Sequence, residues 1–197
     1  MGRSSKVWEP FSPTHMPKRG SMGLHLLIFP NHYTQFIVLR AIFDQYVRDG
    51  FIIYHDLEYN APLIVQGIND VVKRRLVFIK DDEPQRLRLL EYFLISHPKL
   101  TAHFVDSMSA LYLHYIPSFP NVDPSRLIIF LLSLLRKISN NTNIPYLVIH
   151  TTRQMSQVTR RYKPLSQRLW SYAFDTTTLF MLDEAGRILM LTIKRGV

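Results

Sequence analysis

One aspartate at the end of an apolar stretch is the residue of this chain best placed to do chemistry. The stretch LTAHFVD spans residues 100–106, ends at Asp106 and is followed by SMSALY. This composition is typical of a buried strand in a parallel sheet, and ligands of such sheets bind beyond the carboxyl ends of the strands. A carboxylate there can hold a nucleotide-bound metal ion, or it can cap a turn through Ser107 or Ser109.

The nucleotide interpretation requires a phosphate-binding loop, and the sequence lacks the usual one. That loop reads G-x-x-x-x-G-K followed by Ser or Thr, because bare glycine amides surround the phosphates and the lysine reaches the terminal ones. The expected position, residues 29–36, reads FPNHYTQF, without glycine or lysine, and none of the seven glycines precedes a lysine. This favours the capping role for Asp106 and argues against ATP binding in the usual mode.

Other catalytic chemistry is sparse. Glu58 ends the apolar stretch FIIYHDLE at 51–58; in an ATPase such a glutamate positions the attacking water, a task that disappears without a nucleotide. The chain has no cysteine, which excludes disulfides, thiolate metal sites and cysteine nucleophiles, and its eight histidines show no metal-binding spacing. We therefore expect no catalytic residue, no metal site and no cofactor.

Positive charge is concentrated in the segment 151–170, TTRQMSQVTRRYKPLSQRLW, which contains five basic residues and no acidic one. Tyr162 and Trp170 add aromatic rings. Single-stranded nucleic acid is held by cations that follow the phosphates and rings that stack on bases. The residues predicted to contact DNA are Arg153, Arg160, Arg161, Lys163 and Arg168. A loop that docks an acidic protein is the alternative interpretation.

The bulk composition fits one basic domain. The 197 residues carry 24 basic and 15 acidic side chains, a net charge of +9, which favours polyanionic partners. No apolar run approaches the roughly 18 residues of a membrane span, so we expect a soluble protein without a membrane partner. Residues 1–22 lack the apolar core of a secretory signal and are predicted to be a flexible basic tail, with a mitochondrial signal as an alternative. Residues 23–197 are predicted to form the domain.

Predicted strands alternate with predicted helices along the domain. The expected strands lie at 23–29, 51–58, 75–80, 100–107 and 144–152, with a closing hairpin of 176–183 and 187–194. The expected helices lie at 33–50, 61–74, 83–96 and 121–141. Continuous apolar strands between helices predict a mostly parallel sheet covered on both faces. The fold class is therefore α/β, with three layers and a C-terminal antiparallel hairpin.

These motifs together resemble RecA-type recombinases and their eukaryotic paralogues over about residues 23–197. LTAHFVDSMSALY is similar to the family's Walker B strand, so Asp106 falls on its metal-associated aspartate. FIIYHDLE places Glu58 on the catalytic glutamate, and the stretch ending in HTTRQ places Gln154 on the nucleotide-sensing glutamine. The basic segment then falls where the family's second DNA-binding loop lies, and Thr178 stands where an arginine is usual.

The departures from the family indicate a recombinase paralogue without ATPase activity. With no Walker A loop, the chain looks like the small paralogue subunits of Shu-type accessory complexes. That resemblance implies a nuclear protein of homologous-recombination repair that binds single-stranded or forked DNA and helps the main recombinase to load. It also implies two protein partners, another recombinase paralogue and a SWIM-type zinc protein. Tyr112, Tyr115 and Phe119 are the predicted partner interface.

Two alternative functions remain compatible with the sequence. The first is a divergent ATP-binding, DNA-dependent ATPase with an unusual phosphate loop. The second is a protein-only scaffold whose basic segment docks an acidic partner. The two differ from the favoured interpretation in whether the protein responds to nucleotide and whether it binds DNA.

Overall fold

A computed structural model describes residues 7–18, 20–80, 97–115, 117, 121–151 and 173–194. Within these ranges the strands form one eight-stranded sheet in the order β1-β8-β7-β2-β6-β5-β3-β4. The strands are β1 Glu9–Pro10, β2 Leu24–Phe29, β3 Phe51–Asp56, β4 Leu76–Ile79, β5 Leu100–Asp106, β6 Tyr146–Thr151, β7 Thr176–Leu182 and β8 Ile188–Lys194. Every residue of β2, β5 and β6 is buried, as expected for central strands covered on both faces.

The sheet is mostly parallel and closes with an antiparallel hairpin. β2 pairs in parallel with β6 and β7, β5 with β3 and β6, and β3 with β4. β7 and β8 pair antiparallel through a turn in which the backbone N–H of Asp183 donates to the carbonyl of Arg187. The predicted fold class is therefore confirmed.

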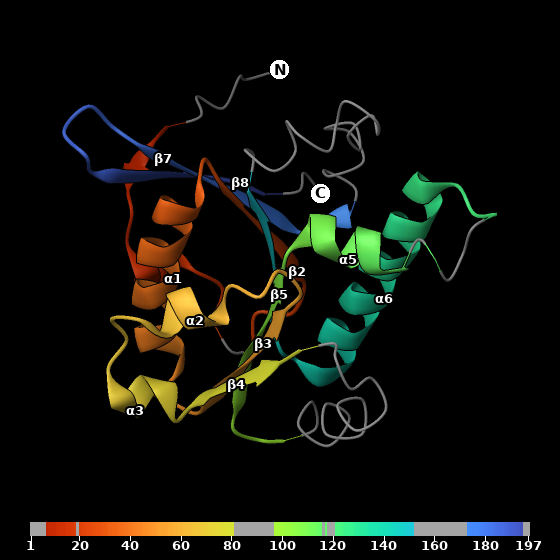
Figure 1. The fold of residues 1–197 in the computed structure, drawn as a ribbon, viewed down its shortest axis with the longest axis horizontal. Helices are drawn as coiled ribbons and strands as arrows, with labels where there is room; N and C mark the ends of the chain where they lie inside the picture. Colours follow the sequence, from red (N-terminus) through yellow and green to blue (C-terminus); the bar gives the residue numbers. More distant parts are fainter. Residues whose placement is uncertain are drawn as a thin grey trace.

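Helices cover both faces of this sheet. They are η1 Pro13–His15, α1 His32–Tyr46, α2 Ala61–Val65, α3 Asp70–Lys73, α5 Met108–Tyr115 and α6 Pro124–Thr142. Figure 1 shows α1, α2 and α3 on one side of the sheet and α5 and α6 on the other. The buried apolar residues form three clusters: one centred on Phe43, Tyr54 and Phe104, one on Leu26, Ile128 and Val148, and a smaller one of Ile53, Ile79, Leu100 and Ile144.

Local sequence explains the differences from the predicted helices. Gly67 has a φ of +80°, which a helix cannot include, so the predicted helix 61–74 is two short helices, α2 and α3. Helix α5 was not predicted, because the two serines and two tyrosines in 107–115 obscure its short apolar pattern. The predicted helix 83–96 lies outside the described residues.

The N-terminal segment contacts the sheet in the structure. β1 pairs antiparallel with β8, matching Glu9 with Met190, and Met16 is buried in the core beside α1. The side chain of Ser12 caps η1 by accepting from the N–H of Thr14. The structure thus places residues 9–16 against the domain, where the sequence led us to expect a tail. Within the described part of the chain, no helix has the length and apolar character needed to cross a membrane.

Candidate functional site

Acidic residues gather where the central parallel strands end. β3 and β5 pair in register up to Asp56 and Asp106, so their last residues lie side by side. Glu58 follows two residues after β3, and α1 begins beside the same edge of the sheet. This is the edge at which parallel α/β sheets bind ligands. The structure therefore brings together Asp106 and Glu58, the two described acids that the sequence singled out.

Asp106 is fully buried, and one of its oxygens receives three hydrogen bonds. Oδ2 accepts from the Tyr54 hydroxyl, from Nε2 of Gln35 at 3.1 Å and from Nδ2 of Asn60 at 3.2 Å. Oδ1 is buried and has no hydrogen-bond partner among the described residues. The carboxylate is thus held by neutral donors inside the protein, and no cation of the described chain faces it at bonding distance.

This environment changes the acidity of Asp106. The pKa of Asp106 is raised to about 7, mainly by burial and also by the nearby Glu58 carboxylate, although the hydrogen bonds from Tyr54 and Asn60 lower it. Burial and the Asp106 charge also raise the pKa of the Tyr54 hydroxyl well above its ordinary value, so Tyr54 remains a donor. Asp106 therefore changes protonation state near neutral pH.

Gln35 connects this carboxylate to a third strand. It lies in the first turn of α1 and is fully buried. Its Oε1 accepts from the Thr151 hydroxyl at the end of β6, at 2.9 Å, and lies 3.2 Å from Nδ1 of His32. The side chain therefore spans from β5 to β6 across the place where a nucleotide-binding protein of this topology would expose its first helical turn to phosphate.

The connection between β2 and α1 is short. It consists of Pro30 and Asn31, whereas the phosphate-binding pattern described above is eight residues long. Oδ1 of Asn31 accepts from the backbone N–H of Thr34 at 2.9 Å and so caps α1. One of the free amides that would bind an anion at this helix end is therefore occupied by the protein's own side chain.

The neighbouring acids also bond within the protein. Asp56 is fully buried and caps α2, because its two oxygens accept from the N–H groups of Asn60 and Ala61 at 2.6 and 2.9 Å. The Ser107 hydroxyl donates to Glu58 and accepts from the N–H of Ala110 at 3.3 Å in the first turn of α5. Asp56 and Ser107 are therefore the residues that cap these helices. The predicted capping role of Asp106 is wrong, because its Oδ2 accepts hydrogen bonds from Tyr54, Gln35 and Asn60 instead.

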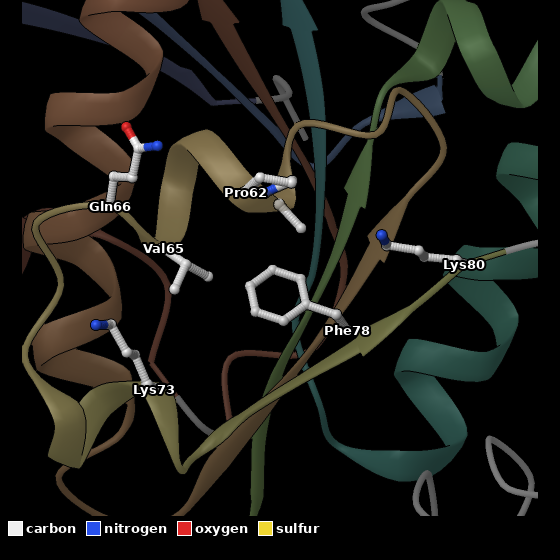
Figure 2. A pocket seen from close by; sticks show the side chains of 7 residues that line it. Pro62, Val65, Gln66, Lys73, Phe78 and Lys80 are labelled. Atoms are coloured by element: carbon white, nitrogen blue, oxygen red, sulfur yellow. The ribbon is translucent and has the colours of Figure 1, made fainter.

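Neither the metal-ligating side chains of the described residues nor the cavity that these residues line marks the acids as a site. No group of three or more metal-ligating side chains occurs among the described residues. A cavity of about 400 Å³ lies beside α2 and β4 and is lined by Ala61, Pro62, Val65, Gln66, Lys73, Phe78 and Lys80. Figure 2 shows the Phe78 ring between Lys73 and Lys80, below α2. Its lining contains no acid, so it does not combine with Asp106 or Glu58 into a catalytic pocket.

Several predicted site residues lie outside the described residues. These are the predicted DNA contacts Arg153, Arg160, Arg161, Lys163 and Arg168, the glutamine Gln154 and the interface residue Phe119. Tyr112 and Tyr115 belong to α5, but their side chains also lie outside the described part. Because β6 ends at Thr151, the basic segment leaves the sheet at the same edge as Asp106.

The sequence did not identify the three residues that hold Asp106. Tyr54 occurs within an apolar strand, and Gln35 and Asn60 occur within helical or turn sequence, so none has a motif of its own. A usable signal was the central position of Tyr54 in β3: a buried tyrosine hydroxyl needs a hydrogen-bond partner, and an acid at the end of the adjacent strand is a suitable one.

Comparison with known structures identifies the architecture. The structure published under the description "Crystal structure of the RadB recombinase" matches 88% of this chain and 81% of its own chain, with a TM-score of 0.58 and 18% sequence identity. At this identity the similarity establishes the fold, which is a RecA-like core. Neither a protein-family model nor a curated protein matches the sequence.

Proposed function

We propose that this chain is a non-catalytic recombinase paralogue that binds DNA and partner paralogues in homologous-recombination repair. In this proposal it acts in the nucleus, on single-stranded or forked DNA, and promotes loading of the main recombinase within a Shu-type assembly. Another paralogue and a SWIM-type zinc protein would be its partners. The chain itself would carry out no chemical step and would require no cofactor.

The hydrogen bonding of Asp106 carries the non-catalytic part of this proposal. A RecA-like ATPase needs this acid to face a nucleotide-bound metal, but here its oxygen is held by Tyr54, Gln35 and Asn60 in the protein interior. The two-residue connection before α1 leaves no glycine loop to surround phosphates. Both features favour a structural role for the former nucleotide edge.

Charge and topology support the DNA-binding part. The protein carries a net charge of +9, and five of its cations fall within 151–170, a segment that contains no acid. This segment follows β6 at the carboxyl edge of the sheet. A long-range positive potential raises the rate and affinity of binding to polyanions, in proportion to the phosphates neutralised.

Fluorescence anisotropy with labelled single-stranded DNA at several salt concentrations tests this proposal. The variant Arg160→Glu, Arg161→Glu, Lys163→Glu should bind more weakly than wild type, and its salt slope should flatten by roughly 2 for three lost contacts. A charge-matched control is Arg48→Glu, Arg74→Glu, Lys99→Glu, because these exposed cations precede β3, β4 and β5 at the opposite edge of the sheet. If both variants lose the same DNA affinity, binding reflects only the net positive charge and the basic segment is not the DNA site.

The alternative functions give different results. An active ATPase should be stabilised by saturating Mg-ATP, since a ligand that binds only the folded protein raises its melting temperature. We expect no shift, and a shift that Asp106→Ala abolishes would establish the ATPase instead. If wild type fails to bind DNA at low salt, alone and with its partners present, the protein-only scaffold is the correct interpretation.

A further inference from the structure

Helix α6 has two apolar faces, although the sheet uses only one. Leu127, Ile128 and Leu132 are buried in the core on the sheet side of the helix. Phe130 and Leu134, one helical turn apart, expose 62% and 45% of their surface. Residues i and i+4 are neighbours on a helix surface, so these two side chains form one apolar patch. Large exposed apolar groups that are contiguous mark interaction sites more often than single ones.

The exposed face continues as a regular stripe along the helix. Arg126 lies one turn before Phe130, and Lys137 lies three residues after Leu134; both are exposed. The spacing of four, four and three residues is that of a seam along which a second helix packs. Figure 1 shows α6 on the side of the sheet opposite α1, and α5 lies next to it. The stripe is thus apolar at its centre and basic at both ends.

We propose that this stripe, defined as Arg126, Phe130, Leu134 and Lys137, binds an amphipathic helix of a different protein. The partner helix would place apolar residues against Phe130 and Leu134 and acidic residues against Arg126 and Lys137. The two basic residues are 11 positions apart, or about 16 Å along the helix, so the partner's acids should be about three turns apart. This proposal rests on the proposed function in one respect: both assume that the chain binds another protein.

Charge argues against a second copy of this chain as the occupant. An antiparallel pair of α6 helices centred between Phe130 and Leu134 brings Arg126 of each copy close to Lys137 of the other. A parallel pair brings each basic residue against itself. Like charges across an interface oppose association, whereas acids at these positions favour it. Nucleic acid is a poorer occupant, because the centre of the stripe is apolar and its aliphatic half offers no stacking surface.

Two synthetic helical peptides of 21 residues test the inference. Both carry the same leucine seam, and they differ only in having glutamate or lysine at the flanking positions. We expect the glutamate peptide to bind the full chain in fluorescence anisotropy at low salt, and the lysine peptide to bind roughly tenfold more weakly. The variant Phe130→Ser, Leu134→Ser should weaken binding of the glutamate peptide by about tenfold or more.

Matched variants distinguish binding at this stripe from nonspecific binding at other exposed apolar residues. Leu63→Ser, Val71→Ser removes two apolar side chains that are 48% and 65% exposed on α2 and α3, and it should leave peptide binding unchanged. Arg126→Glu, Lys137→Glu should reverse the preference, so that the lysine peptide binds better. This gain of binding requires a folded protein.

Several results would overturn the proposal. It fails if neither peptide binds at millimolar concentration, or if the Leu63 and Val71 changes reduce binding as much as those on α6. Sedimentation velocity would also reject it by revealing a dimer that Phe130→Ser, Leu134→Ser dissociates. The same α6 variant should bind single-stranded DNA as wild type does. Failure of DNA binding in wild type would contradict the function proposed above and leave the peptide result intact.

Discussion

Nε2 of Gln35 lies 3.1 Å from Oδ2 of Asp106 and ties the first turn of α1 to the carboxyl end of β5. The same amide accepts from Thr151, so one buried side chain joins a helix and two central strands. A nucleotide-binding protein of this topology keeps that space for its ligand. Here the Gln35 side chain occupies that space and links α1, β5 and β6, so substitutions at this edge should change the stability of the fold.

Asp106→Asn should stabilise the protein, and more so at alkaline pH. The pKa of Asp106 is about 7 in the folded protein and 3.8 in the unfolded chain. The stability that this difference provides is fully present below pH 3.8 and is lost as the pH rises through 7. Asparagine is neutral at every pH and removes this loss. We expect the gain in the free energy of unfolding to be about 2.5 kcal/mol larger at pH 8 than at pH 5.

Urea unfolding at the two pH values measures this difference. Asp49→Asn, which neutralises an exposed acid, is the control for a change of net charge alone. An Asp106→Asn effect of the same size at pH 5 and pH 8 would contradict a carboxyl group that titrates near neutrality.

Gln35→Met should destabilise the protein by about 2–4 kcal/mol, because it leaves Asp106 and Thr151 each short of a buried hydrogen bond. Methionine has a similar length, so little cavity volume is added. Gln45→Met on the same helix is the control, since Oε1 of Gln45 has no hydrogen-bond partner among the described residues. Equal destabilisation by the two changes would mean that the Gln35 bonds contribute nothing.

Two buried histidines should make the protein sensitive to acid. Burial lowers the pKa of His25 and of His150 to about 4. The pKa of a histidine in the unfolded chain is 6.5, so the stability that these two residues contribute is fully present above that pH. It is lost as the pH falls towards 4, by up to about 3 kcal/mol for each histidine. Asp106 has the opposite dependence, so stability should be greatest between about pH 6 and 7.

A pH series of urea unfolding tests this expectation. His25→Gln should reduce the slope of stability against pH between pH 4 and 6.5, because one of the two groups no longer titrates. His15→Gln, at an exposed position, is the control for replacing a histidine outside the core. Stability that rises continuously from pH 7 to pH 4 would disprove the assignment.

Gly23→Ala should destabilise the protein by about 2–3 kcal/mol. Gly23 has a φ of +124°, and an added Cβ would lie 2.5 Å from Oδ2 of Asp175, which accepts from the N–H of Leu24 at 2.9 Å. Gly186 also has a positive φ, +74°, but open space around it. Gly186→Ala therefore measures a substitution at positive φ without a steric contact. Chemical denaturation of both variants shows how much more the change costs at Gly23, where φ is larger and Asp175 is close.

Sequence patterns predicted the strands well because buried parallel strands are continuous apolar runs. β2 and β5 were each predicted within one residue at either end, and β6 within two. Short elements were predicted less well: α5 has eight residues with polar groups on several sides, and the break at Gly67 depends on a backbone conformation that the helical spacing conceals. Local patterns describe an element's own burial and do not encode neighbours distant in sequence.

In the candidate site, too, local patterns located some residues, whereas contacts between residues distant in sequence were missed. Asp106 and Glu58 were located from the sequence because each ends an apolar stretch. Among the partners of Asp106 only Tyr54 gave a usable signal. Gln35 gave none, because it is 71 residues from Asp106 in sequence and meets it only through the strand order. The predicted DNA contacts in 151–170 depend on charge density alone and remain a prediction.

The strand order also determines when this protein can fold during synthesis. β2 is completed by residue 29, but its neighbours β6 and β7 begin at residues 146 and 176. Until the ribosome has released those strands, both edges of β2 lack their native partners. Pairings this distant in sequence form slowly and leave aggregation-prone surface exposed. Efficient production in cells should therefore depend on chaperones that bind the nascent chain until its last hairpin emerges.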